Sequence, residues 1–359
     1  MADNPTSPVR RDVVVVGGGQ AGLAMGYHLQ KTGLDFTILD AGPVVGHVWR
    51  SRWDSLRLFT PAQYANLPGL PFPAPVDTYP GRDQVADYLT TYADHFNLPI
   101  QLRSRATALS REHDGFAVTA PTGTYLARQV VIATGPFSTP FVPSLAGGLA
   151  PELLQIHTAG YRSPDQVPAG RVLVVGGGNS GFQIAAELAT AGRHVELAEG
   201  TRNACIPQRP LGRDLFWWQD RIGLLRVTAE SRLGRLIAAN DGTVIGSTRA
   251  RLRDLGVTVR SRVVNAAGRS VTFDDADTTA VDAVVWATGF RIDDTWIQLP
   301  DALDTQSRLI QRRGVVEAAP GLFTIGRAWQ HTTGSALLGF VQHDAAWIAA
   351  QLATNIADA

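Results

Sequence analysis

Two stretches of the chain carry the same order of apolar and polar positions. Each opens with a run rich in valine, Val13–Val16 in one and Arg171–Val175 in the other. Such a run is typical of a strand buried on both faces of a parallel sheet. Three glycines, an apolar helical stretch, a closing glycine and a second short strand follow each run. The pattern predicts a β-α-β unit that occurs twice, once around Gly17 and once around Gly176.

Later elements repeat as well. The segments Val130–Gly135 (VVIATG) and Val284–Gly289 (VVWATG) are matching strand-and-turn elements, one late in each half. A strand-like piece, Gly321–Gly326, and a final helix from about Gly334 follow the second of them. The fold class predicted is α/β, with two Rossmann-like dinucleotide-binding domains, the second inserted into the first.

The positions of Pro and Gly residues along the chain predict the domain boundaries. We expect residues 1–163 and 290–359 to form a first, discontinuous domain, and residues 168–285 to form the inserted second domain. The junctions contain the Pro and Gly residues that are common at such crossings. Residues 203–246 read as one or two amphipathic helices inserted into the second domain.

Composition narrows the class of protein. Hydrophobic residues make up 45% and charged residues 18%, with a formal net charge of zero, so nothing points to nucleic acid or an anionic membrane surface as a partner. No segment is apolar over the roughly 18 residues that a membrane span needs, and the N-terminus lacks the apolar stretch of a signal peptide. We therefore expect a cytoplasmic enzyme. The chain has one cysteine, Cys205, which cannot form an intrachain disulfide.

The first glycine motif has the spacing of a dinucleotide-binding loop. Its residues are Gly17, Gly19, Gln20, Ala21 and Gly22. In a GxGxxG loop the first glycine permits the tight turn, the second lets the backbone approach a pyrophosphate, and the third lets helix and strand pack closely. The helix N-terminus then offers free N–H groups to the phosphates. Asp40 ends the second strand, where a carboxylate can accept the ribose hydroxyls of an adenosine.

The second motif repeats this arrangement. Its residues are Gly176, Gly178, Asn179, Ser180 and Gly181. Glu199 stands where Asp40 stands in the first unit, and a carboxylate there favours the free ribose of NAD. Arg202 follows closely, and an arginine near that strand end is what a 2′-phosphate requires. These two signals conflict; we expect NADPH, with Arg202 as phosphate ligand and NADH as the alternative.

Two dinucleotide sites in one chain are typical of hydride transfer from a nicotinamide to a flavin. We assign FAD to the first domain and NAD(P) to the second, and we predict no metal site. Thiol–disulfide exchange needs a redox-active cysteine pair, which this chain lacks.

The paired GGGxxG motifs, the two ATG elements and the stretch Gly46-His47-Val48-Trp49 resemble group B flavin monooxygenases. Residues 51–73 look like the corresponding stretch of the YUCCA-type and related bacterial enzymes, and Gln63 fits the YUCCA-type pattern. The sequence departs from the family where Pro61 replaces an Asn usual in flavin-containing monooxygenases. The resemblance implies that NADPH reduces FAD, that O₂ adds at flavin C4a, and that the resulting (hydro)peroxide gives one oxygen atom to a small organic substrate. It also implies that Trp49 packs on FAD, and that a homodimer is a family-level expectation.

The segment before the final helix supplies further candidates. Gln330 and His331 are candidates to face the substrate or the flavin, as is Gln63, and Thr332 and Thr333 are expected to bind the cofactor. The N-terminus of the final helix should point at the flavin and stabilise negative charge on it. Two alternatives remain open at this point, an NAD(P)H oxidase or electron-transfer reductase without oxygenation, and a dinucleotide-binding sensor without catalysis.

Overall fold

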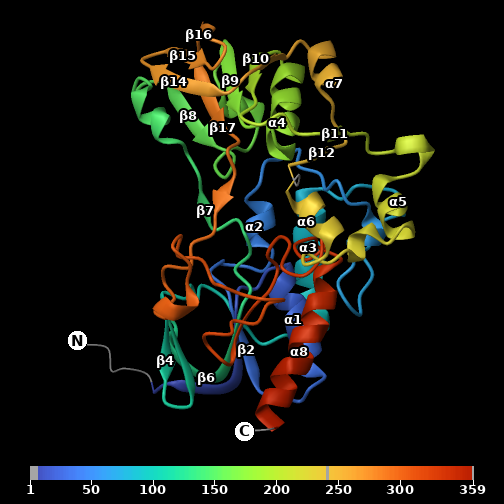
Figure 1. Ribbon diagram of the computed structural model, residues 1–359, viewed down its shortest axis with the longest axis vertical. Helices are drawn as coiled ribbons and strands as arrows, with labels where there is room; N and C mark the ends of the chain where they lie inside the picture. Colours follow the sequence, from blue (N-terminus) through green and yellow to red (C-terminus); the bar gives the residue numbers. More distant parts are fainter. Residues whose placement is uncertain (1–6, 240–241, 358–359) are drawn as a thin grey trace.

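The computed structural model describes residues 7–239 and 242–357, which form two lobes joined by crossing segments (Figure 1). The first lobe is built on a seven-stranded sheet in the order β3-β2-β1-β6-β5-β4, with β19 paired to β6. Its strands are β1 (Val9–Val16), β2 (Phe36–Leu39), β3 (Ile100–Gln101), β4 (Ala108–Glu112), β5 (Gly115–Ala120), β6 (Gly123–Ile132) and β19 (Leu322–Thr324). β1, β2, β3, β6 and β19 run parallel, while β4 and β5 form an antiparallel hairpin against β6.

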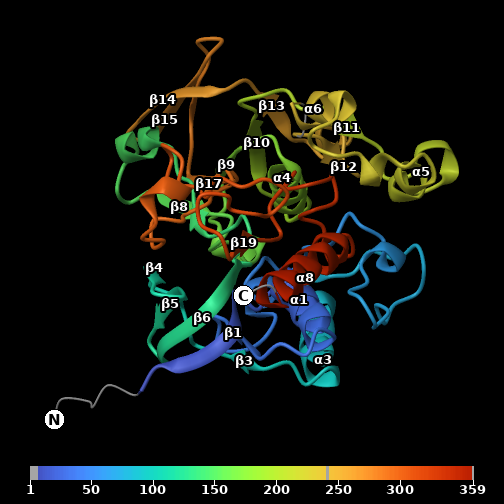
Figure 2. The same ribbon diagram turned by 60° about the horizontal axis from the view of Figure 1, so that its bottom comes forward.

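Alternate residues of β1 face two separate cores, because side chains in a strand point to opposite faces in turn. Val13 and Val15 pack with the helices α1 (Gln20–Gln30), α3 (Arg82–His95) and α8 (Val341–Ala357). Val14 and Val16 pack with apolar residues of the hairpin and of the segment 297–322. Both faces of the strand are therefore buried, as its unbroken valine run predicts. Helices α1 and α8 lie side by side on one face (Figure 2).

The second lobe repeats the first on a smaller scale. Its five-stranded parallel sheet has the order β13-β10-β9-β17-β8. The strands are β8 (Leu154–His157), β9 (Arg171–Val175), β10 (His194–Ala198), β13 (Thr258–Arg260) and β17 (Ala283–Trp286). Helices α4 (Asn179–Thr190) and α7 (Arg249–Asp254) and an antiparallel sheet of β14 (Val263–Ala267), β15 (Ser270–Phe273) and β16 (Thr278–Ala280) complete it.

The crossing between the lobes lies earlier than the sequence indicates. The sequence predicts that the first segment ends at residue 163, but β8 (residues 154–157) pairs with β17 in the second sheet. Its register places Leu154 beside Ala283 and covers the edge that β17 would otherwise expose. The two crossing strands, β7 (Thr139–Pro140) and β18 (Phe290–Arg291), pair with each other between the lobes (Figure 1).

The segment 203–246 contains two short helices, α5 (Leu215–Arg221) and α6 (Arg232–Ala238), in its described part. Two short parallel strands, β11 (Cys205–Ile206) and β12 (Val244–Ile245), bring its ends together. The segment leaves the second lobe and lies beside the first (Figure 1). None of the helices in residues 7–239 and 242–357 combines the length and apolar character that a membrane crossing requires.

The final helix begins at Val341, not near Gly334 as the sequence suggested. Two glycines bend the preceding chain against its neighbours. A Cβ on Gly339 would lie 2.1 Å from the Tyr64 carbonyl oxygen, and one on Gly334 would lie 2.8 Å from Cβ of Phe340. Residues 331–340 form successive turns. These turns, and not the N-terminus of the final helix, directly follow Gln330.

A buried ion pair ties the crossing segment to the chain beyond β19. Asp294 is fully buried and accepts hydrogen bonds of 2.8 Å from both terminal nitrogens of Arg327. It also accepts the Leu309 N–H at 2.9 Å. Replacing Asp294 by Ala leaves a buried guanidinium without a partner, so we expect a loss of about 3–5 kcal/mol in the free energy of unfolding.

Denaturant unfolding monitored by circular dichroism measures this loss. The matched control is Asp87→Ala, which removes an exposed carboxylate that pairs with Arg50 at 2.6 Å. That change should cost less than about 1 kcal/mol. Equal losses in the two variants would contradict the structural role of the buried pair.

Candidate functional site

The first glycine of each motif sits against the strand that ends beside it. Gly17 has φ +114° and Gly176 has φ +129°, values that L side chains rarely adopt. A Cβ would lie 2.4 Å from the Ala133 carbonyl oxygen at Gly17, and 2.2 Å from that of Ala287 at Gly176. Ala133 and Ala287 are the alanines of the two ATG elements. The glycine motif and the ATG element, which both occur twice in the sequence, therefore contact each other once in each lobe.

The other glycines of the two motifs shape an open cradle. A Cβ on Gly22 would lie 1.8 Å from the Gly17 carbonyl oxygen, and one on Gly181 would lie 1.9 Å from that of Gly176. Gly19 and Gly178, by contrast, have nothing within 4 Å of a Cβ. The space before each helix is thus free for a group that approaches the backbone closely.

Amide groups point into that space at each helix start. In α1 the Leu23 N–H bonds to the Gly19 carbonyl, which leaves the amides of residues 20–22 without a partner inside the helix. In α4 the Phe182 N–H bonds to the Gly178 carbonyl in the same way, so Asn179, Ser180 and Gly181 offer free amides. Free amides at a helix N-terminus bind phosphate, and the residues present fit a pyrophosphate in both lobes.

The two acids at the ends of the second strands have different surroundings. The Asp40 carboxylate accepts the Gly18 and Gly42 amides, each at 2.7 Å. Glu199 is 7% exposed and forms an ion pair with Arg249 at the start of α7. Arg202 is exposed on the turn that follows. The sequence did not reveal the partner of Glu199, because Arg249 lies fifty residues further along the chain.

The chain between β19 and α8 lies against the first glycine loop. A Cβ on Gly326 would lie 2.8 Å from Cβ of Ala21, and the Gln20 side chain donates to the Ala336 carbonyl at 2.9 Å. The structure therefore brings Gln330, His331 and the following threonines into the neighbourhood of the first cradle. Gln330 is 4% exposed, and its Nε2 has no hydrogen-bond partner among the described residues.

The segment 203–246 covers this chain from the other side. The Ala229 N–H donates to the His331 carbonyl at 2.8 Å, and the Thr333 hydroxyl donates to the Leu224 carbonyl at 3.2 Å. Thr228 and Thr332 form an antiparallel bridge between the same two segments. A part of the second lobe thus closes over the candidate flavin site of the first lobe.

An aromatic cluster, formed by Phe59, Tyr64, Phe216 and Phe340, extends this cover. Phe216 of α5 stacks on Phe59 with ring centroids 6.0 Å apart, and Tyr64 stacks on Phe340 at 6.3 Å. Tyr64 also contacts Phe216 at 6.3 Å. Phe216 lies in an aromatic run of the sequence, residues 216–218. The other three rings come from segments with no common spacing, so no pattern could have grouped them.

A buried carboxyl group supports the turn at His331. The Ser335 hydroxyl accepts the His331 and Thr332 amides at 3.1 and 2.9 Å and bonds to the Asp344 side chain. Burial raises the pKa of Asp344, and this effect is only partly offset by the Ser335 hydroxyl. Burial also lowers the pKa of His331, and the charge of Arg313 adds to that effect. No motif or spacing in the sequence distinguishes Asp344 from other acidic residues.

Some predicted site residues are engaged elsewhere. The Gln63 side-chain amide donates to the Asp77 carboxylate and its oxygen accepts the Asp77 N–H, each at 2.8 Å. Both polar ends of Gln63 are therefore bound to Asp77. Trp49 lies on the short helix α2 (His47–Arg50) and packs, half-buried, against the core beside α1 and α3. Their roles in binding or catalysis remain predictions.

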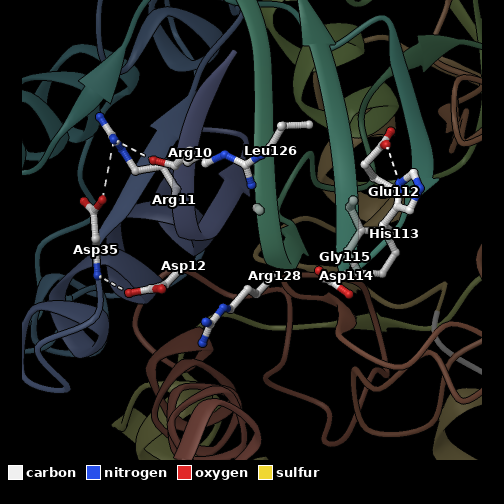
Figure 3. A pocket seen from close by; sticks show the side chains of 12 residues that line it. Arg10, Arg11, Asp12, Asp35, Glu112, His113, Asp114, Gly115, Leu126 and Arg128 are labelled. Carbon is white, nitrogen blue, oxygen red and sulfur yellow. Dashed lines mark hydrogen bonds and ion pairs between the residues drawn. The ribbon is translucent and has the colours of Figure 1, made fainter. Parts of the chain in front are cut away.

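A surface hollow of about 900 Å³ lies at the end of the first sheet that is far from the glycine loop (Figure 3). Charged side chains from β1, from the β4–β5 turn and from β6 line it, among them Arg10, Glu112 and Arg128. Arg10 stands six residues before Val16, roughly 20 Å along the strand from the glycine loop. This hollow is therefore separate from the dinucleotide cradles.

Known proteins are similar to this chain over nearly its whole length. A family model described as pyridine nucleotide-disulphide oxidoreductase matches residues 14–209. An uncharacterized CzcO-like oxidoreductase of Geobacillus kaustophilus is 41% identical, over 94% of this chain and 97% of its own. The chain belongs to the pyridine nucleotide-disulphide oxidoreductase family.

Within that family the chain is similar to flavin monooxygenases. A flavin-containing monooxygenase from Stenotrophomonas maltophilia has a structure that matches with a TM-score of 0.82 at 29% identity, covering 97% of this chain and 99% of that one. The indole-3-pyruvate monooxygenase YUCCA6 of Arabidopsis thaliana is 29% identical over 80% of this chain and 78% of its own. The predicted membership of the group B flavin monooxygenases is confirmed, as are the two-lobed α/β fold and the cofactors, FAD and NADPH. The protein is an enzyme, a flavin-dependent oxidoreductase of the monooxygenase type.

The glycine cradles make a paired prediction. Gly19→Val should abolish FAD binding, because the added side chain fills the space where the backbone must meet a pyrophosphate. Gly178→Val should leave the protein yellow but slow its reduction by NADPH. Both glycines have negative φ and no atom near a Cβ, so both variants should fold. Flavin absorbance per protein, checked against far-ultraviolet circular dichroism, measures the first effect; a yellow Gly19→Val protein would refute the assignment.

The raised pKa of Asp344 makes a prediction about stability. A carboxyl with a higher pKa in the folded state binds its proton more tightly there, so its stabilising effect is present below its ordinary pKa of about 4 and is lost as pH rises through the folded value. Asp344→Asn should remove this loss. Thermal unfolding midpoints at a series of pH values from 4 to 7 should fall less steeply in the variant.

The control for this prediction is Asp304→Asn. The pKa of Asp304 is lowered, first by the Arg308 backbone N–H and then by its guanidinium. The stabilising effect of this carboxylate is complete above its ordinary pKa of about 4, so Asp304→Asn should leave the slope between pH 4 and 7 close to that of the wild type. Equal slopes in wild type and Asp344→Asn would show that Asp344 does not titrate abnormally.

Proposed function

We propose that this enzyme uses NADPH to reduce FAD bound in the first lobe and then transfers one oxygen atom from O₂ to a small organic substrate with a soft nitrogen, a soft sulfur or a carbonyl group. The observation that carries the proposal is the closure of the segment 224–229 over residues 331–333. Oxygen transfer, unlike simple oxidation of NADPH, requires that water be kept from the reacting flavin. A cover held by main-chain hydrogen bonds suits that requirement.

The residues of the chain have three tasks in this proposal. The free amides of residues 20–22 and the Asp40 carboxylate hold the phosphates and ribose of FAD, and the amides of residues 179–181 hold the pyrophosphate of NADPH. Flavin supplies the redox chemistry and the activation of O₂ when it is bound. Ser335 and Asp344 fix the turn that carries His331, and Gln330 has a buried side-chain N–H group free to meet a ligand.

The aromatic cluster supports a substrate with an apolar body. Phe216 is 2% exposed and joins the cover to Phe59 and Tyr64. The similarity to an enzyme named for oxidising indole-3-pyruvate, a carbonyl compound with an aromatic ring, points in the same direction. We place carbonyl compounds with an apolar group first among substrates to screen.

Rapid mixing tests the proposal. The flavin is reduced anaerobically with NADPH and mixed with oxygenated buffer while its absorbance is followed. We expect a transient spectrum that differs from those of oxidised and reduced flavin, followed by little release of hydrogen peroxide when substrate is present. Direct return to oxidised flavin with one peroxide per NADPH under all substrates tested would favour an NAD(P)H oxidase instead.

A variant of the cover sharpens the test. Phe216→Ala should raise the peroxide released per NADPH several-fold, because it opens the cluster to water. Trp217→Ala is the matched control, since Trp217 contacts only Trp218 and Arg213 among described aromatic and cationic partners. A similar peroxide yield in both variants would count against a protective role of the cover.

A further inference from the structure

The Glu199–Arg249 pair lies where the adenosine end of NADPH is expected. The Arg249 Nε donates to one Glu199 carboxylate oxygen at 2.7 Å, and its Nη2 donates to the other. The side chains are 14% and 5% exposed, for Arg249 and Glu199 respectively. Hydrogen bonding to Glu199 raises the pKa of Arg249, so the guanidinium stays charged. Both oxygens that could accept a ribose hydroxyl therefore already carry a donor with a positive charge.

The corresponding acid of the first lobe is arranged differently. Asp40 is bound by two backbone amides and has no ion-pair partner among the residues that the structure describes. Its negative charge is available to the ribose of FAD, which bears no 2′-phosphate. At corresponding positions of the repeat, the first lobe thus has a carboxylate bound only by amides, and the second lobe has a carboxylate paired with a guanidinium.

Two further arginines border the turn after Glu199. Arg262 donates to the Gly200 carbonyl at 2.6 Å and is exposed. Arg202 is exposed and makes no hydrogen bond or ion pair within the described part of the chain. Asn203 holds the turn on the glycine loop by a bond of 3.1 Å to the Gly177 carbonyl. Once Glu199 is neutralised, the charge around this turn is positive.

We infer that Arg249 is the positioning residue that sets coenzyme choice: by pairing with Glu199 it removes the carboxylate that would repel a 2′-phosphate, which Arg202 and Arg262 then bind. The inference rests on the proposed NADPH site in the second lobe. In the sequence, Glu199 favours NADH and Arg202 favours NADPH. The inference resolves this conflict, because a Glu199 carboxylate paired with Arg249 no longer favours NADH.

Arg249 acts through Glu199 rather than on the phosphate. Its other donor groups are also engaged, since Nη2 donates to the Asn203 carbonyl at 2.8 Å as well as to Glu199, and Nη1 donates to the Cys205 sulfur at 3.2 Å. It is also largely buried, unlike Arg202. A residue that acts through its partner can be replaced when the partner is replaced with it, and this property distinguishes it from a direct ligand.

Calorimetric titration of the FAD-loaded enzyme tests the inference, with adenosine 2′,5′-bisphosphate and NADP⁺ compared against ADP and NAD⁺. Arg249→Met should weaken binding of the two 2′-phosphates by at least about tenfold, because it leaves an unpaired carboxylate beside them. Glu199→Gln should not weaken them. The double variant should return to within about threefold of wild type.

Arg251→Met is the matched control, because Arg251 lies on the same helix, is exposed and makes no side-chain bond among the described residues. It should leave every affinity unchanged. Three results would overturn the inference: equal affinity of wild type for the two coenzymes, a double variant no better than Arg249→Met, or a tenfold loss of NAD⁺ binding in Glu199→Gln. If Arg249→Met does not fold, the Glu199→Gln and double variants still decide. Binding is measured without O₂ transfer, so the oxygenation proposal can fail while this inference stands.

Discussion

The architecture depends on one close contact, made once in each lobe, between the first glycine of a dinucleotide loop and the carbonyl of an alanine at the end of the neighbouring strand. Gly17 meets Ala133, and Gly176 meets Ala287, at distances that no side chain would allow. The contact fixes where the chain leaves the central strand and turns into its helix. The free amides of that helix are thereby directed beyond the carboxyl ends of the strands, where a parallel sheet binds its ligands.

The site between the lobes results from what the second lobe adds to this repeated frame. Segment 203–246 is anchored at its own lobe by β11 and β12 and meets the first lobe through main-chain bonds to residues 331–333 and through the ring of Phe216. The first lobe contributes the turn at His331, which Ser335 and the buried Asp344 hold in place. In the proposed mechanism this cover keeps water from the flavin, and contacts from both lobes form it.

The two sites are alike in backbone and unlike in charge. Their glycine loops make the same close contacts, at Gly17 and Gly176 and again at Gly22 and Gly181. Their acids differ: Asp40 is bound by amides and Glu199 by a guanidinium. A dinucleotide fold supplies phosphate binding through the main chain, which tolerates changes of sequence. We infer that discrimination between coenzymes depends instead on side chains from distant parts of the chain, such as Glu199 and Arg249.

The sequence by itself determined the repeated β-α-β units, the α/β class, both glycine loops and the cofactors, because these are encoded by local spacing and by apolar runs of strand length. It also excluded an intrachain cysteine pair, since Cys205 stands alone. Only the tertiary structure decided that β8 joins the second sheet, that the final helix begins at Val341 and that Gln63 is engaged by Asp77. The same holds for the partner of Glu199 and for the aromatic cluster. These features depend on contacts between segments far apart in the chain, and such contacts leave no periodic signal because each segment satisfies its own local pattern whether or not the other is near.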